Sequence, residues 1–412
     1  MAKNTLEQIY SNKKIEYQKE RYQSSEEKFI SVFNEKPVRF FSAPGRSEIC
    51  GNHTDHNKGC VLAAGVSMDV IAAVVPTNDG IIQIQSEGYP LIKVNIDDLS
   101  ANDSEKNSSV ALIRGVTAGF ADKGYNIGGF KAYTLTSVLK GSGLSSSAAF
   151  EVLVCTILNG LYNDDKVDPV EIAKISQFAE NKYFGKPSGL MDQMASSVGG
   201  LISIDFMNTA DPIINKVNFD FSRCGHALCI VDTKGSHANL TPEYAAIPKE
   251  MKYIAGYFNV DCLRKITKND IITNYRLLRK RFGDRAVLRA LHFMDDNERV
   301  SKECAALENG KFNEFLRLVN ESGDSSYMYL QNVYPSSSPE KQGLSSALYI
   351  AKDILKGKGA CRVHGGGFAG TIQAFVPYSM LDDFRSGIEG VFGKGSCHVL
   401  SIRPVGGTEV IL

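Results

Sequence analysis

The clearest pattern of apolar and polar positions lies between residues 150 and 161. Apolar residues recur there at intervals of three and four positions: Phe150, Leu153, Val154, Ile157, Leu158 and Leu161. This spacing puts them on one face of an α-helix, so it predicts a helix that packs against a core. Immediately before it, residues 130–139 are rich in Thr, Tyr and Val and predict a strand.

Similar patterns predict the other elements of the chain. Short apolar and β-rich runs predict strands over 70–75, 82–85, 225–231, 361–364 and 371–376. Helical stretches are predicted over 169–183, 243–258, 284–307, 311–320 and 340–356. Residues 1–36 also look helical, and one face of that segment can be formed by Leu6, Ile9, Tyr10 and Tyr17. This mixture of strands and helices predicts an α+β fold.

Length and composition limit the kinds of protein this chain can be. Its 412 residues favour two domains, which we place at 1–212 and 213–412. Lys plus Arg equals Asp plus Glu, 46 each, which argues against a nucleic-acid partner held by a whole-chain positive field. No run approaches the roughly 18–20 apolar residues that span a bilayer, so we expect no membrane partner. Nine cysteines without a Cys-x-x-Cys pair favour reduced thiols in a cytoplasmic protein.

A Gly/Ser-rich loop, Gly141-Ser142-Gly143-Leu144-Ser145-Ser146-Ser147-Ala148, joins the predicted strand to the predicted helix. Its two glycines let the backbone approach a ligand closely, and the following helix presents free N–H groups and its positive dipole end to an anion. The serines add hydroxyl donors or a ligand for Mg²⁺. The loop matches neither the Walker nor the dinucleotide-binding pattern. Such a stretch alone is most often a plain loop with a helix cap, so the phosphate-binding interpretation depends on the rest of the chain.

Three further stretches, in order with this loop, resemble motifs of the galactokinases, which belong to the GHMP kinases. Residues 43–57, Ala-Pro-Gly-Arg-Ser-Glu-Ile-Cys-Gly-Asn-His-Thr-Asp-His-Asn, resemble the signature Pro-Gly-Arg-Val-Asn-Leu-Ile-Gly-Glu-His-Thr-Asp-Tyr-Asn. Residues 183–193 are similar to the segment ending Cys-Gly-Ile-Met-Asp-Gln, and residues 363–370 to the C-terminal Gly-rich motif. The resemblance implies a two-domain GHMP kinase fold, with an N-terminal domain like domain 2 of ribosomal protein S5 and a ferredoxin-like C-terminal domain. It also implies a kinase that uses ATP and Mg²⁺ to convert galactose to α-galactose 1-phosphate.

Four residues match the phosphoryl-transfer groups of the family. By resemblance, Asp192 is the catalytic base that takes the proton of the sugar hydroxyl, and Arg46 pairs with it. The apolar residues on both sides of Asp192 also favour a functional carboxylate over a solvated surface charge. Ser147 and Glu180 match the residues that hold Mg²⁺, and residues 141–148 match the loop that binds ATP.

Five residues match the sugar-binding positions of the family: Asn52, His53, Asp55, Gly189 and Tyr244. The run His53-Thr54-Asp55-His56 can also be interpreted as a metal site, but no further cluster at a metalloenzyme spacing supports that interpretation. The resemblance implies the sugar and ATP as small-molecule partners, and we expect a monomer or a weak homodimer.

The match is weaker in the sugar pocket than in the phosphoryl-transfer residues. Asn52 stands where the family has a Glu that contacts the sugar's C6 hydroxyl, and Glu48 stands where it has Asn. An amide in place of a carboxylate removes a negative charge, so the site would tolerate a C6 carboxylate better. Whether Glu48 and His56 shape the pocket or only support it stays open from the sequence.

Three hypotheses remain at this point. The first is a galactokinase, the second is the same 1-kinase acting on a related sugar such as galacturonate, and the third is a non-catalytic galactose-sensing regulator. The relatives that act as sensors tend to have a damaged phosphate loop. The presence of residues 145–148, Glu180 and Asp192 therefore favours an enzyme.

Overall fold

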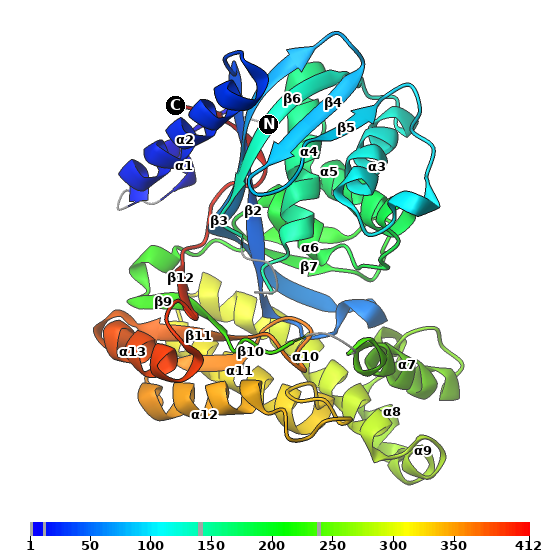
Figure 1. The fold of residues 1–412 in the computed structure, drawn as a ribbon. Coiled ribbons are helices and arrows are strands. Elements are labelled where there is room, and N and C mark those ends of the chain that lie inside the picture. Colours follow the sequence, from blue (N-terminus) through cyan, green and yellow to red (C-terminus); the bar gives the residue numbers. More distant parts are fainter. Residues whose placement is uncertain (1–2, 11–13, 139–142, 237–239) are drawn as a thin grey trace.

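The computed structural model describes residues 3–10, 14–138, 143–236 and 240–412 and contains two β-sheets, one above the other in Figure 1. Within this described part, the larger sheet has nine strands in the order β1-β13-β2-β3-β6-β4-β5, and β7 and β8 extend it from β3. Its strands are β1 Asn4–Thr5, β2 Arg39–Cys50, β3 Cys60–Thr77, β4 Ile81–Ser86, β5 Ile92–Asn95, β6 Gly129–Thr136, β7 Leu201–Asp205, β8 Ile213–Lys216 and β13 Thr408–Ile411.

Helices cover both faces of the larger sheet. One face packs against α3 Ser109–Asp122, α4 Ser146–Tyr162, α5 Pro169–Phe178 and α6 Met191–Val198, and the other against α1 Leu6–Ile9 and α2 Ile15–Phe33. The strand β3 shows why its sequence is a nearly continuous apolar run. Val70, Ala72 and Val74 join the cluster under α3–α5, while Ile71 and Ala73 point to the α1–α2 side. A strand that is buried on both faces needs no polar alternation.

The smaller sheet has the order β10-β11-β9-β12 and is antiparallel throughout. Its elements are β9 His226–Asp232, α12 Gly343–Leu355, β10 Ala360–Val363, β11 Thr371–Pro377, α13 Leu381–Phe392 and β12 Cys397–Leu400. This succession of strands and helices is the β-α-β-β-α-β arrangement of a ferredoxin-like fold, as expected. Between β9 and α12 the chain adds α7 Thr241–Tyr257, α8 Lys268–Thr273, α9 Tyr275–Phe282, α10 Asp284–Glu308 and α11 Phe312–Ser325.

The two sheets share one apolar core. Leu62 and Ala64 of β3 belong to the same buried cluster as Ile230 of β9 and Phe375 of β11, and Phe315 of α11 also joins it. On its other face the smaller sheet packs against α12 and α13. Because the core is continuous, the two halves pack directly against each other.

The structure departs from the predicted division of the chain in two places. The boundary between residues 212 and 213 falls one strand too early, because β8 pairs with β7 in the larger sheet. The last residues do not stay with the second half either, since β13 returns to pair with β2 and β1 of the larger sheet. Pairing of β13 with β2 satisfies backbone N–H and C=O groups that would otherwise be unpaired at a sheet edge. The hydrophobic pattern of the sequence does not show which strand pairs with that edge.

Most predicted helices and strands are confirmed, with a few differences. The helix predicted over 169–183 is split into α5 and a π-helical turn, Ala179–Phe184. Tyr17 does not join the buried face of the N-terminal helices, since its side chain is exposed. The long strand β2 was not predicted as a strand at all. None of the helices in the described ranges has the length and apolar character needed to cross a membrane.

Candidate active site

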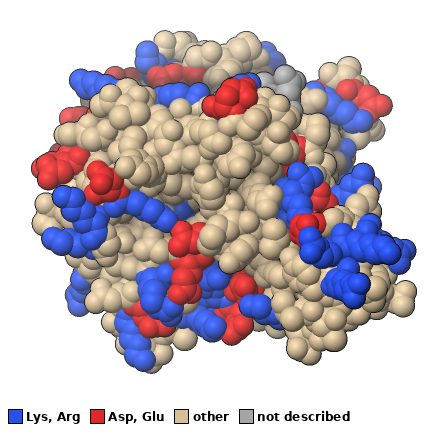
Figure 2. Space-filling model, turned by 90° about the horizontal axis from the view of Figure 1, so that it is seen from below, with Lys and Arg blue, Asp and Glu red and all other residues tan. Residues whose placement is uncertain are grey.

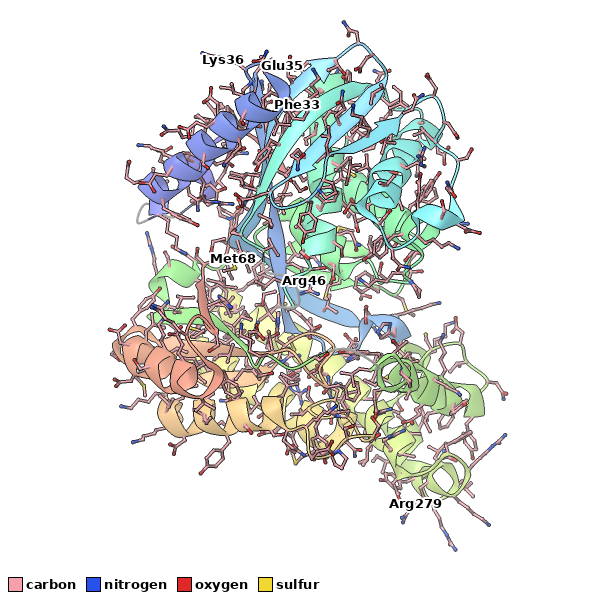
Figure 3. All side chains as sticks on the ribbon, viewed as in Figure 1. Phe33, Glu35, Lys36, Arg46, Met68 and Arg279 are labelled. Carbon is pink, nitrogen blue, oxygen red and sulfur yellow. The ribbon has the colours of Figure 1, made fainter. Side chains whose placement is uncertain are left out.

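A cavity of about 130 Å³ opens beside β2, where the two sheets meet. Figure 3 shows Arg46 on β2 between the two halves of the molecule. The lining includes Arg46, Glu48, His53, Asp55, Met191 and Gly366, which come from segments far apart in the sequence. The pairing of β2 with β3 shifts register after Pro44 and again after Glu48. Such bulges change the direction in which side chains point. The two bulges lie on either side of Arg46 and Glu48, the charged residues of β2 that line the cavity.

Asp192 lies in the first turn of α6 and is held by two donors. Its Oδ1 accepts a hydrogen bond from Arg46 Nε at 2.7 Å, and its Oδ2 accepts one from Ser145 Oγ at 2.5 Å. Burial opposes the charged form, but the guanidinium and the hydroxyl outweigh it and lower the pKa of Asp192. The carboxylate is therefore ionised at neutral pH, while 26% of its side-chain surface stays exposed.

The Gly/Ser loop approaches Asp192 from the other side. Gly141 and Ser142 lie outside the described residues, but Gly143 to Ala148 are described. Arg46 donates from its backbone N–H to Leu144 O at 3.0 Å and from Nη1 to Gly143 O. Ser145 has a left-handed backbone with φ of 57° and its side chain does not cap α4. The first N–H groups of α4, at Ser146 to Ala148, are thus available to an anion.

Glu180, in the π-helical turn, lies beside the same loop. Its Oε1 accepts from Ser147 Oγ at 3.1 Å and from Lys186 Nζ at 2.8 Å. Its Oε2 accepts from Gln193 Nε2 at 2.8 Å, and the same nitrogen donates to Glu151 Oε2 at 3.1 Å. Burial and the nearby Glu180 charge raise the pKa of Glu151 well above its ordinary value.

The donor set around Glu180 fits a magnesium ion. Mg²⁺ prefers carboxylate and hydroxyl oxygens and takes only a few of them from the protein. Glu180 and Ser147 offer one oxygen of each kind, already 3.1 Å apart. In the described structure, the ammonium group of Lys186 forms an ion pair with Oε1 of Glu180 at 2.8 Å.

Two of the predicted sugar-binding residues, His53 and Asp55, line the cavity, and a third, Gly189, lies against Asp55. His53 Nε2 lies 2.9 Å from Gly366 O, and burial together with His56 lowers the pKa of His53 to about 4. His53 is therefore neutral at neutral pH and donates to that carbonyl. The Asp55 carboxylate lines the cavity, and a Cβ at Gly189 would lie 2.6 Å from Asp55 Oδ2. A side chain at position 189 would therefore require the Asp55 carboxylate to move.

The other two predicted sugar-binding residues lie outside the cavity lining. Tyr244 packs against Gly366, and its hydroxyl donates to Gly367 O at 2.9 Å. It therefore supports the Gly-rich turn rather than the cavity itself. Asn52 is fully buried and makes its hydrogen bonds with protein groups, whereas Glu48 lines the cavity. The structure thus assigns Glu48 and His56 to the lining, which the sequence left open.

Some residues of the site were not identified from the sequence. Lys186 and Gln193 fall within the segment similar to the family motif, but no role was inferred for either. Glu151 follows Ser147 by four positions, so both lie on one face of α4. A carboxylate in an otherwise apolar stretch of helix is the sequence signal that could have identified Glu151 as a buried, partnered residue.

Comparisons with known proteins agree with this geometry. The family model described as "Galactokinase galactose-binding signature" matches residues 27–76, and "GHMP kinases N terminal domain" matches residues 111–200. The chain is 30% identical to a galactokinase of Streptomyces coelicolor over 89% of this chain and 92% of that protein. It is 28% identical to a galactokinase of Bacillus subtilis over 86% and 90% of the two chains.

Solved structures show the same relationship. The galactokinase of Lactococcus lactis complexed with galactose superimposes with a TM-score of 0.79 and 25% identity, covering 94% of this chain and 99% of that one. A mevalonate kinase of Methanococcus jannaschii matches with a TM-score of 0.63 and 13% identity over 89% and 98% of the two chains. The second likeness concerns the fold alone.

Proposed function

This chain belongs to the galactokinase family, and on that premise we propose that it transfers the γ-phosphoryl group of ATP to the C1 hydroxyl of galactose. The products are α-galactose 1-phosphate and ADP. The observation that carries the proposal is the position of Asp192, whose two oxygens contact Arg46 beside the sugar cavity and Ser145 of the phosphate loop. One carboxylate therefore lies between the two places where the reactants would bind.

In the proposed reaction, Asp192 takes the proton of the C1 hydroxyl while the sugar oxygen attacks the γ-phosphorus. The new oxygen–phosphorus bond forms as the bond to the β–γ bridging oxygen breaks, and ADP leaves with that oxygen. A carboxylate with a lowered pKa is a weak base. Proton transfer is therefore favourable only when the oxygen–phosphorus bond has begun to form and the hydroxyl has become more acidic. Before that point the carboxylate orients the hydroxyl.

The other groups bind and position the phosphates. The N–H groups at the start of α4 and the hydroxyls of Ser146 and Ser147 would hold phosphate oxygens. Glu180 and Ser147 would hold Mg²⁺, which when bound neutralises negative charge on the phosphates. Arg46 keeps Asp192 ionised and fixes the loop through Gly143 O.

The structure does not support the observation that favoured galacturonate as the substrate. It depended on Asn52 replacing a carboxylate in the sugar pocket. Asn52 does not line the cavity, and the carboxylates of Glu48 and Asp55 do. A sugar with a negative charge at C6 would meet these two groups, so the proposed substrate is the neutral sugar.

The variant Asp192→Asn tests the proposed base. We expect kcat with galactose to fall by about 10²–10⁴-fold, because the amide cannot accept the proton. The affinity for ATP, measured by equilibrium binding, should change little. Asp211→Asn is the matched control, since Asp211 is exposed on the surface, and it should leave kcat unchanged. Near-normal turnover in Asp192→Asn would remove Asp192 as the base.

A further inference from the structure

The pair formed by residues 48 and 52 has its carboxylate and its amide in the opposite order from the family signature. The signature has Asn and Glu at these two positions, and this chain has Glu48 and Asn52. The two side chains are in contact, because Asn52 Nδ2 donates to Glu48 Oε1 at 3.0 Å. The number of carboxylates in the pair is therefore unchanged, while the position of the carboxylate has moved.

The amide of Asn52 has no capacity left for a ligand. Its Nδ2 donates to Glu48 Oε1 and to Gly365 O at 2.7 Å, which uses both N–H groups. Its Oδ1 accepts from Asn332 Nδ2 at 2.8 Å and from Ser326 Oγ at 3.3 Å, which uses both lone pairs. With no exposed surface, Asn52 would have to break one of these bonds to contact a sugar.

Glu48 has the opposite properties. Its Oε1 is held by Asn52 and by Arg362 Nη2 at 2.9 Å, and Arg362 is itself fully buried. Among the described residues no hydrogen bond reaches Oε2, and Glu48 lines the cavity together with Arg46 and Asp55. A carboxylate that is oriented through one oxygen and faces a cavity with the other is a prepared acceptor for a hydroxyl.

We propose that Glu48 is the substrate-binding carboxylate of this pair and that Asn52 is a positioning residue. Glu48 Oε2 accepts a hydrogen bond from a hydroxyl of the sugar, and Asn52 fixes Glu48 relative to the Gly-rich turn at Gly365. Asn52 also fixes the backbone of its own segment, since its N–H donates to Asp296 Oδ2 at 2.7 Å and its carbonyl accepts from His292 Nε2 at 3.0 Å.

The assignment also defines the class of substrate, given the proposed function on which it rests. Glu48 and Asp55 both line the cavity, and the cations beside it are already paired, Arg46 with Asp192 and Arg362 with Glu48. Burial raises the pKa of Glu48 to about 7 even beside Arg362, so no cation is left over to receive a further carboxylate. A neutral hexose offers hydroxyl donors to these carboxylates, whereas a uronate brings a further negative charge. Glu48 is therefore a specificity-determining residue that favours galactose over galacturonate.

The test is the variant Glu48→Gln, assayed with galactose and with galacturonate. Glutamine keeps an oxygen that can accept from Asn52 and Arg362, but it places an amide nitrogen in the cavity. We expect the KM for galactose to rise about 10- to 100-fold while the KM for ATP stays unchanged, because the oxygen that accepts from the sugar hydroxyl is replaced by an amide nitrogen that cannot accept. The galactose to galacturonate ratio of kcat/KM should fall at least about tenfold.

Glu48→Asp provides the conservative comparison and keeps the proposal testable if the glutamine variant folds poorly. It retains the charge on a shorter side chain, so the KM for galactose should rise while the discrimination against galacturonate persists. An unchanged ratio in Glu48→Gln, or an equal loss for both sugars together with a raised KM for ATP, would overturn the proposal. If the wild-type protein itself releases no ADP with galactose, the proposed function fails instead, so the two failures are distinguishable.

Discussion

Arg46 connects three parts of the candidate site through a single residue. Its Nε donates to Asp192, its Nη1 donates to Gly143 O, and its backbone N–H donates to Leu144 O. Arg46 therefore positions both the proposed base, Asp192, and the Gly/Ser loop. At the level of single residues, the charge of Arg46 is what keeps a partly buried Asp192 ionised.

The variant Arg46→Gln should change the pH dependence of catalysis in a defined direction. In the wild type, the lowered pKa of Asp192 puts the loss of activity on the acid side below the ordinary range for an Asp. Without the guanidinium, burial dominates and the pKa of Asp192 rises, so this acid limb should move to higher pH by about 1–3 units. The measurement is kcat/KM against pH. Arg46→Lys, which keeps the positive charge, should shift the limb less, and an acid limb that does not move in Arg46→Gln would contradict the proposed pairing.

Some residues of the site were predictable and others were not. Arg46 and Asp192 stand in contiguous motifs, so the sequence located both. Asn52 was predicted to contact the sugar, and the structure does not place it there. The hydrogen bonds that occupy its amide come from Ser326, Asn332 and Gly365, which lie far away in the chain. No local pattern predicts which of two neighbouring polar side chains is already satisfied.

Among the structural elements, the phosphate loop and the Gly-rich C-terminal motif depend on each other. Gly143 has a φ of 72°, and a Cβ there would lie 2.8 Å from Thr371 Oγ1 and 3.0 Å from His364 Nδ1. His364 and Thr371 are themselves in hydrogen-bond contact at 3.1 Å. The smaller sheet therefore limits the position of a loop that belongs to the larger one.

Gly143→Ala should consequently impair the binding of ATP. The added Cβ meets Thr371 and His364, so the loop and the Gly143 carbonyl that accepts from Arg46 must move. We expect kcat/KM for ATP to fall about 10- to 100-fold, because small displacements in a reaction centre are costly. Gly124→Ala is the matched control, since Gly124 has a φ of 76° and open space around it. It should lose about 1–2 kcal/mol of stability from backbone strain but keep its kinetics. Equal kinetic effects in both variants would refute the contact.

Helices and strands could be predicted where the sequence shows a clear hydrophobic period. The helices α4, α10 and α12 were predicted because their apolar residues recur at helical spacing. The strand β2 was missed because Pro44 and Gly45 lie inside it, and both residues argue against a strand. The register shifts near these residues accommodate them. The irregular part of β2 is also the part that faces the cavity.

In the molecule as a whole, the C-terminal segment from Arg403 to β13 stabilises the larger sheet. The buried Asp69 accepts hydrogen bonds from Arg403 Nη1 at 2.9 Å, Ser42 Oγ at 2.7 Å and Arg21 Nη1 at 2.8 Å. Tyr10 donates to the same carboxylate. One side chain on β3 thus joins the N-terminal helices, β2 and the segment that leads into β13. The predicted domain boundary at residues 212 and 213 assigned this segment to the second domain, so its pairing with the larger sheet was not predicted.

Asp69→Ala should lower the free energy of unfolding by about 3–5 kcal/mol, because it leaves the buried guanidinium of Arg403 without a counter-charge. Burial opposes the charge of Asp69, but Arg21 and Arg403 outweigh it and lower its pKa. The stabilisation is therefore complete above the unfolded value of about 3.9 and is lost as the pH falls below it. Urea unfolding measures the difference. Asp261→Ala removes an exposed partner of Lys58 and Lys265 and should unfold like the wild type. A similar stability of both variants would contradict the role of Asp69.

The zero net charge of the chain conceals an uneven distribution. Figure 2 views the molecule from below and shows one group of Lys and Arg side chains at the right, on the side of α8 and α9, and further groups at the left and lower left, where Asp and Glu lie among them. The last turn of α9 contributes Arg279, Lys280 and Arg281. The composition gives only the total charge, and the fold shows where the charges lie.

The most direct test is the release of ADP by the purified protein with ATP, Mg²⁺ and a panel of monosaccharides and uronic acids. Galactose should give the highest kcat/KM, with one α-galactose 1-phosphate formed for each ADP. Galacturonate should be used at least about tenfold less efficiently, because Glu48 and Asp55 face the sugar cavity. Absence of ADP release above the sugar-free background with galactose, or a preference for galacturonate, would contradict the proposed galactose 1-kinase.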